Sequence, residues 1–163
     1  IGAKYENAHR DRVLLAFVEP AKQLLKAYGD RFVLPVDFAY EEAGARKEVA
    51  LKDLPLDDAM MLDIGAQSVA VFEEELMKAG TIFVNGPAGV YENELFSYGT
   101  DRIWNAIAKS SAYSVIGGGD TVTAASKFID LKEVNYVCTA GGAMVRFLSG
   151  KRLPLIEAML NSK

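Results

Sequence analysis

The stretch Ala112 to Phe128, which reads AYSVIGGGDTVTAASKF, decides how the rest of the chain is interpreted. Tyr113 to Ile116 form a short apolar run with the length and β-branched character of a buried strand. Gly117, Gly118 and Gly119 follow, and the residues after them predict a helix. Because glycine has no Cβ, this turn lets a ligand approach the main chain, and the unpaired amides of the next helical turn bind anions. The stretch therefore predicts a phosphate site made by a strand, a glycine turn and a helix.

Asp120 stands where this helix begins, and its carboxylate has two possible roles. It can cap the first helical turn, or it can hold a Mg²⁺ ion that bridges phosphate oxygens. An anion beside a phosphate loop is unfavourable unless a cation lies between them, which favours the metal. Thr121 can likewise bind a phosphate oxygen or cap the helix. Neither GxxxxGK[ST] nor a complete GxGxxG occurs in the sequence, so the glycine turn alone is a weak indication of nucleotide binding.

Two further strands end in glycine-containing turns. Thr81 to Val84 runs into residues 85–89, NGPAG, and Val134 to Cys138 runs into residues 140–142, AGG, before another predicted helix. Alternating strands and helices predict an α/β fold with a mainly parallel sheet and right-handed crossovers. The three turns then lie along one edge of the sheet, at the carboxyl ends of the strands, where ligands bind in such folds. Three converging turns favour a site for a large anionic ligand over ordinary tight turns.

Periodicity predicts several further elements. Pro20 interrupts a helical pattern that extends from Asp11 to Tyr28, which predicts a kink or a helix start at that proline. Trp104 is predicted to lie in the core, on the inner face of a helix. The polar stretch 41–58 reads as a solvent-facing excursion with one short strand over 48–51. The other predicted elements are a strand over 32–40 and helices over 67–78, 100–109, 143–148 and 154–160.

Composition limits the class of protein. With 163 residues, half of them hydrophobic, we expect one α/β domain over residues 1–163. The net charge of -4 argues against nucleic acid or an anionic membrane as the partner. No apolar run has membrane-spanning length and no secretory signal is recognised, so we expect a cytoplasmic location. The single cysteine, Cys138, cannot form an internal disulfide, which suits a reducing compartment.

Taken together, these motifs resemble a known family. VNGPAGVYE (Val84 to Glu92), VIGGGDTVTAASK (Val115 to Lys127) and CTAGGAMVRFLSGKRLP (Cys138 to Pro154) are similar, in order and separation, to the carboxyl-terminal half of phosphoglycerate kinase. LPVDF (Leu34 to Phe38) and LDIGAQS (Leu62 to Ser68) are two weaker matches. The resemblance implies an incomplete carboxyl-terminal lobe with a Rossmann-like, three-layer α/β fold. It also implies a kinase of glycolysis and gluconeogenesis that moves a phosphoryl group between 1,3-bisphosphoglycerate and ADP, forming 3-phosphoglycerate and ATP.

The resemblance also implies roles for individual residues. Asp120 is expected to hold Mg²⁺. The backbone amides of Gly118 and Gly119 are expected to contact the transferred phosphoryl group, with support from Gly141 and Gly142. Leu62 is expected to touch the adenine and Glu92 to hold the ribose hydroxyls. The full set expected to bind ADP or ATP is Leu62, Asn85, Pro87, Val90, Glu92, Gly117, Gly118, Gly119, Asp120 and Thr121.

Several positions depart from the family pattern. Ala140 stands where the family has a third glycine, and Met61 replaces a glycine beside the adenine. Val84 replaces a tryptophan and Tyr91 a phenylalanine, which suits a distant, archaeal-like branch. The amino-terminal lobe that binds phosphoglycerate and a GGAK turn with its lysine are not in this sequence, and Lys4 is at the wrong distance to be that lysine.

We therefore expect this portion to bind Mg-ADP or Mg-ATP and to be inactive alone, because 3-phosphoglycerate is bound through the amino-terminal lobe. The alternative is a stand-alone, non-catalytic nucleotide-binding or interaction module. A dehydrogenase-like dinucleotide domain is disfavoured because the GxGxxG pattern is absent. An exposed edge of an incomplete sheet would also favour self-association.

Overall fold

The computed structural model describes residues 8–54, 56 and 59–162, with residues 8–13 described by their backbone alone. The chain folds into two compact units. The first unit consists of Ile1–Glu74 and Ala88–Ile103, and the second of Glu75–Pro87 and Trp104–Lys163. A single α/β domain over residues 1–163 stays a prediction.

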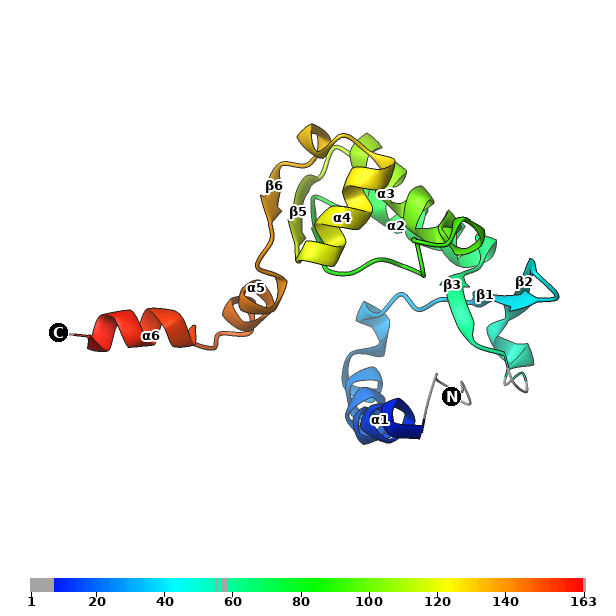
Figure 1. Cartoon of the computed structure of the whole chain (residues 1–163), viewed down its shortest axis with the longest axis horizontal. Coiled ribbons are helices and arrows are strands. Elements are labelled where there is room, and N and C mark those ends of the chain that lie inside the picture. Colours follow the sequence, from blue (N-terminus) through cyan, green and yellow to red (C-terminus); the bar gives the residue numbers. More distant parts are fainter. Residues whose placement is uncertain (1–7, 55, 57–58, 163) are drawn as a thin grey trace. The chain divides into compact units, whose positions relative to one another are not determined.

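The second unit contains the predicted parallel sheet. Strands β4 (Thr81–Val84), β5 (Tyr113–Gly117) and β6 (Tyr136–Cys138) are all parallel and lie in the order β4-β5-β6. Figure 1 shows β5 and β6 side by side. The register pairs Val84 with Ile116 and Gly117 with Cys138, so the three carboxyl ends lie together at one edge. This confirms the predicted α/β fold class with its parallel sheet.

Helices follow these strands as predicted. α4 (Gly119–Phe128) comes directly after β5, and α5 (Gly141–Leu148) comes after β6, so both helices begin at the carboxyl edge of the sheet. A last helix, α6, covers Pro154–Asn161. The core of this unit includes Ile116 and Trp104, whose side chains are buried, and this confirms the predicted place of the tryptophan. Burial of these apolar side chains stabilises the edge from which the glycine turns project.

The first unit has an antiparallel sheet that the sequence did not suggest. Strands β1 (Asp37–Glu42), β2 (Ala45–Ala50) and β3 (Met61–Ile64) lie in the order β2-β1-β3. Ala43 and Gly44 join β1 to β2, with φ angles of 52° and 78°. Two consecutive positive φ values are typical of a two-residue hairpin turn. The prediction of a polar excursion missed this hairpin because alanine rarely adopts such a backbone angle.

Among the described residues, three α-helices begin in the first unit. α1 (Ala8–Tyr28) continues through Pro20, so the alternative that a helix starts at this proline was wrong. α2 (Ala66–Lys78) is capped by the buried carboxylate of Asp37, which accepts hydrogen bonds from the amides of Gln67 and Ser68 at 2.9 and 2.8 Å. α3 covers Tyr98–Lys109. Short 3₁₀ turns cover Gly29–Arg31, Leu51–Asp53, Glu94–Phe96 and Leu131–Glu133. Within the described part of the chain, no helix has the length and apolar character needed to cross a membrane.

Candidate functional site

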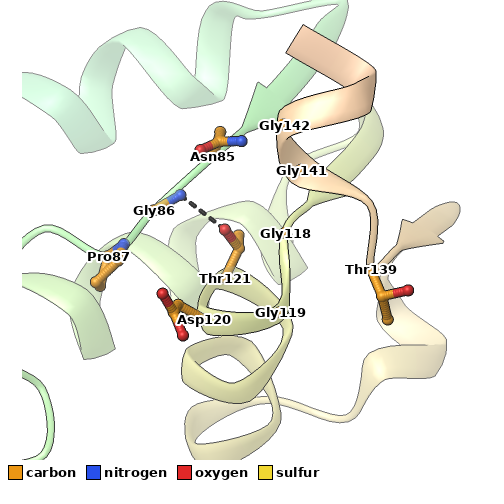
Figure 2. A pocket seen from close by; sticks show the side chains of 10 residues that line it. All are labelled: Asn85, Gly86, Pro87, Gly118, Gly119, Asp120, Thr121, Thr139, Gly141 and Gly142. Atoms are coloured by element: carbon orange, nitrogen blue, oxygen red, sulfur yellow. Dashed lines mark hydrogen bonds between the residues drawn. The ribbon is translucent and has the colours of Figure 1, made fainter. Parts of the chain in front are cut away.

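A pocket of about 330 Å³ lies in the second unit, at the carboxyl ends of β4, β5 and β6 (Figure 2). All three predicted turns contribute to it, so the sheet brings them together. The residues that line it are Asn85, Gly86, Pro87, Gly118, Gly119, Asp120, Thr121, Thr139, Gly141 and Gly142. Gly117, also expected at the site, is instead buried at the end of β5, where a Cβ would lie 2.9 Å from the sulfur of Met144.

The turns approach each other so closely that only glycine fits. Gly118 has a φ of 110°, a backbone conformation that favours glycine. An ideal Cβ on Gly141 would lie 2.7 Å from the Cα of Gly118 and 3.2 Å from Nδ2 of Asn85. Main-chain atoms of the turns that follow β5 and β6 are therefore in direct contact across the floor of the pocket.

Two helix N-termini supply hydrogen-bond donors to this edge. The first bond of α4 runs from the Val122 amide to the Gly118 carbonyl, and the first bond of α5 runs from the Met144 amide to the Ala140 carbonyl. Within the described residues, no partner is found for the preceding three amides of either helix, which are those of Gly119, Asp120, Thr121, Gly141, Gly142 and Ala143. Such orphan amides, together with the positive ends of the helix dipoles, favour a bound anion.

The structure modifies the expectation for Gly118. Its amide donates a hydrogen bond to the Cys138 carbonyl at 2.9 Å, as an extension of the β5–β6 ladder. This amide is therefore engaged, and the available donors of the turn begin at Gly119. Gly118 shapes the pocket through its backbone angle instead.

Asp120 and Thr121 are adjacent in α4, but their side chains have different surroundings (Figure 2). The N-cap residue of α4 is Gly118, which has no side chain, and Asp120 is the acidic residue of the first turn. Asp120 is exposed, and its carboxylate has no partner among the described residues. The buried Thr121 hydroxyl donates to the Gly117 carbonyl at 2.8 Å and accepts from the Gly86 amide at 2.7 Å. Thr121 therefore ties the turn after β4 to the turn after β5.

The pocket has an unusual charge for a phosphate site, because no lysine or arginine is among the described residues that line it and Asp120 carries the one formal charge there. A cation is needed to bring a polyphosphate next to this carboxylate. No group of three or more carboxylate, cysteine or histidine side chains in the described residues can hold a metal by itself. One carboxylate, completed by phosphate oxygens and water, is the donor set that suits Mg²⁺.

The expected nucleoside contacts belong to the first unit. The amide of Val90 donates a hydrogen bond to the Leu62 carbonyl at 2.8 Å, so the structure brings these two predicted residues together. Glu92 lies two residues after Val90 in the same loop and is exposed, so its carboxylate is accessible.

Asp63, next to Leu62, is a buried carboxylate that sequence reasoning did not single out. Its side chain is fully buried and forms an ion pair with Arg46 at 2.9 Å. Burial raises the pKa of Asp63 above 3.8, although hydrogen bonds from the Gly99 amide, Arg46 and the Ile64 amide oppose the shift. Two more residues line the pocket outside the expected binding set: Gly86, which lies in the predicted turn 85–89, and Thr139, which was not singled out. Their position just after predicted parallel strands is the signal that could have found them.

Comparisons with known proteins agree on one family. The family model described as phosphoglycerate kinase matches residues 1–151. The phosphoglycerate kinases of the archaea Methanothermus fervidus and Thermoplasma volcanium are 41% and 40% identical to this chain, over 88% and 90% of its length. The matches cover 34% and 35% of those two proteins.

Solved structures give the same result. The crystal structure of phosphoglycerate kinase from Pyrococcus horikoshii OT3 matches 98% of this chain with a TM-score of 0.84 and 34% identity. The structure from Coxiella burnetii matches 87% with a TM-score of 0.76 and 38% identity. The matches cover 40% and 38% of those chains, so this chain spans about a third to two fifths of its relatives. On the family match over residues 1–151, the chain belongs to the phosphoglycerate kinase family.

Proposed function

We propose that this chain is the nucleotide-binding part of a cytoplasmic phosphoglycerate kinase. The complete enzyme transfers a phosphoryl group between 1,3-bisphosphoglycerate and ADP to give 3-phosphoglycerate and ATP. The observation that carries the proposal is the pocket of the second unit, where two helix N-termini with unpaired amides meet beside the unpartnered carboxylate of Asp120. The nucleotide phosphates bind there, and the family resemblance assigns the nucleoside contacts to Leu62, Val90 and Glu92.

The chemistry of phosphoryl transfer suits such a site. The reaction requires the reacting groups to be positioned and the charge on the transferred oxygens to be neutralised, and it requires no covalent protein intermediate. The amides of Gly119, Gly141 and Gly142 stabilise this charge, and they are held in place by the surrounding turns. Bound Mg²⁺ supplies further positive charge to the phosphate oxygens, and Asp120 is the residue that holds it.

Calorimetric titration of ADP into this chain, with and without Mg²⁺, tests the proposal. We expect binding to require Mg²⁺, because the pocket lining offers no basic side chain to offset the Asp120 charge. Asp120→Asn should weaken Mg-ADP binding at least about tenfold, which corresponds to about 1.4 kcal/mol. Asp53→Asn, which removes one charge from an exposed 3₁₀ turn of the first unit, is the control and should bind as the wild type does.

The proposal fails if the folded chain does not bind Mg-ADP. The metal role of Asp120 fails if Asp120→Asn binds as tightly as the wild type, or if ADP binds equally well without Mg²⁺.

The alternative is a stand-alone, non-catalytic binding module. A turnover measurement tells whether the isolated chain only binds nucleotide or is an enzyme by itself. We expect the isolated chain to bind nucleotide without consuming it, because it spans about a third of its relatives and its pocket lining has no basic side chain for a second phosphorylated substrate. ATP consumption that depends on 3-phosphoglycerate, in a preparation free of other kinases, would contradict this expectation.

Self-association through a strand edge is a further expectation. Within the described residues, β4 and β6 are the outer strands of the parallel sheet, and such edges tend to pair with other chains. Light scattering should then show a mass that rises with concentration. A monomeric mass at high concentration would contradict the expectation.

A further inference from the structure

We propose that Arg46 is a positioning residue for the nucleoside side of the site. It holds the loop of residues 88–97, called here the nucleoside loop, which carries Val90 and Glu92. The inference rests on the proposed function, because that function assigns the nucleoside contacts to this loop. All the residues that carry the inference lie in the first unit.

The guanidinium of Arg46 joins the nucleoside loop to strand β3. Its Nη1 donates to Oδ2 of Asp63 at 2.9 Å and to the Leu95 carbonyl at 3.2 Å. Its Nη2 donates to the Ile64 carbonyl at 2.9 Å and to Oε1 of Glu48 at 3.0 Å. The Arg46 side chain is only 17% exposed, and its bonds to Asp63 and Ile64 are partly buried, whereas those to Leu95 and Glu48 are exposed. One side chain therefore links β2, β3 and the carboxyl end of the loop.

Asp63 also holds the residues that flank the nucleoside loop. Its Oδ2 also accepts a hydrogen bond from the Gly99 amide at 2.9 Å, directly after the loop, and its Oδ1 accepts one from the Ile64 amide at 2.9 Å. A Cβ on Gly89 or on Gly99 would overlap Oδ1 of Asp63. The backbone at both ends of the nucleoside loop thus closes on this one carboxylate.

The two ends of the loop are held differently. The amino end is held by backbone and hydroxyl groups, since the Thr100 hydroxyl accepts from the amides of Ala88 and Gly89 at 3.2 and 3.3 Å. The Val90 amide also donates to the Leu62 carbonyl at 2.8 Å. The carboxyl end is held by Arg46 and Asp63, by the packing of the buried Phe96, and by Asn93, whose Oδ1 accepts from the Leu95 amide at 3.0 Å. Loss of Arg46 would leave a buried carboxylate without its cation and the Leu95 and Ile64 carbonyls without this donor.

A lysine cannot replace this arginine fully. The guanidinium is a planar fork that serves acceptors in several directions, whereas an ammonium is a compact charge. The four acceptors of Arg46 come from three segments of the chain, and the ring of Tyr98 lies 5.4 Å from its central carbon. Arg46→Lys should therefore keep the charge beside Asp63 and lose part of the hold on the loop.

Amide hydrogen exchange in the free chain tests whether Arg46 holds the loop. Arg46→Gln should speed exchange at Phe96 and Gly99, whose amides lie at and directly after the carboxyl end of the loop, at least about tenfold, and Arg46→Lys by a smaller factor. Arg102→Gln is the matched control, because Arg102 pairs with Glu73 at 2.8 Å on the exposed surface of the same unit. Unchanged exchange in both Arg46 variants would overturn the proposal. If Arg46→Gln does not fold, Arg46→Lys decides alone.

Titration with two ligands then tests the consequence for the nucleotide. Mg-ADP presents a nucleoside and phosphates, whereas Mg-pyrophosphate presents phosphates alone. Both Arg46 variants should lose at least about fivefold in Mg-ADP affinity and keep their pyrophosphate affinity within about twofold, which corresponds to about 1 and 0.4 kcal/mol. Equal losses for both ligands would indicate a merely structural role and overturn the proposal, as would unchanged Mg-ADP binding. If the wild type binds no Mg-ADP, the proposed function fails, and the positioning role of Arg46 for the nucleoside fails with it. Faster amide exchange in the Arg46 variants would then still show that Arg46 holds the loop.

Discussion

The pocket of the second unit is bounded largely by main-chain atoms, whereas the nucleoside loop of the first unit is held by two charged side chains. Five of the ten residues that line the pocket are glycines, and its available donors are backbone amides. The loop instead closes on Asp63, whose side chain is fully buried, and on Arg46. The two regions are therefore built from different groups, main-chain amides in one and charged side chains in the other.

This difference predicts opposite sensitivities to mutation. A surface made of main-chain atoms in contact cannot accept an added methyl group, because packed backbone segments have no alternative rotamer. A network of charged side chains can accept small changes of volume and suffers when one charge is removed, because the partner stays buried without compensation.

The largest effect is expected from Gly141→Ala. The added Cβ would lie 2.7 Å from the Cα of Gly118, so one of the two turns must move. We expect a loss of about 3 kcal/mol in the free energy of unfolding, as for overpacking in a tight core. Binding of Mg-ADP should fall below detection, since the pocket walls separate. Urea denaturation and calorimetry measure the two effects.

Gly142→Ala is the matched control for stability. It lies next to Gly141 in α5, and a Cβ there would meet nothing within 4 Å. A free helical position gains about 0.4–1 kcal/mol on this substitution through the unfolded state. If the two alanine variants have the same stability, the close contact of the turns is not a constraint on the fold.

Sequence reasoning predicted the second unit well because its signals are local. Strand β4 has the predicted bounds, Thr81–Val84, and β5 extends one residue beyond the predicted Ile116. Short β-branched runs that end in glycine specify both the element and its end. The convergence of the turns then follows from the parallel sheet, without any contact having to be predicted.

The same reasoning could not find the Arg46–Asp63 pair. The two residues are 17 positions apart, in a polar stretch and at the end of a strand, and no periodicity relates them. Their contact depends on the β1–β2 hairpin, whose Ala43 turn has no sequence signal. The engagement of the Gly118 amide was also invisible, since it depends on pairing with β6. Contacts between side chains that are distant in sequence can be predicted only when the register of the sheet is known.

Thr121, which lines the pocket, and Thr123, two residues later in α4, differ in burial and in hydrogen bonding. Thr121 and Thr123 both donate their hydroxyl to the carbonyl four residues earlier in the region of α4, at 2.8 and 3.0 Å. Thr121 is buried and also accepts from the Gly86 amide, whereas Thr123 is exposed. Replacement of Thr121 by valine leaves buried polar groups unpaired and should cost about 2 kcal/mol. Thr123→Val should change the free energy of unfolding by less than about 0.5 kcal/mol, and equal effects would contradict the tie between the two turns.

The smallest expected effect is a pH dependence that reports on the side-chain network. Because burial raises the pKa of Asp63 above 3.8, the folded state binds more protons than the unfolded state at pH values between 3.8 and the folded pKa. The contribution of Asp63 to stability therefore falls as the pH rises through this window, by less than about 1.4 kcal/mol per pH unit. Asp63→Asn removes this contribution and keeps those of other carboxylates. As the pH is lowered toward 3.8, the wild type should gain stability relative to Asp63→Asn, measured as the free energy of unfolding.

A relative gain in stability by the variant would mean that Arg46 and the amides stabilise the carboxylate by more than its burial costs. The expected sign means instead that the fold accepts a cost at Asp63, which is understandable if the carboxylate serves to hold the nucleoside loop.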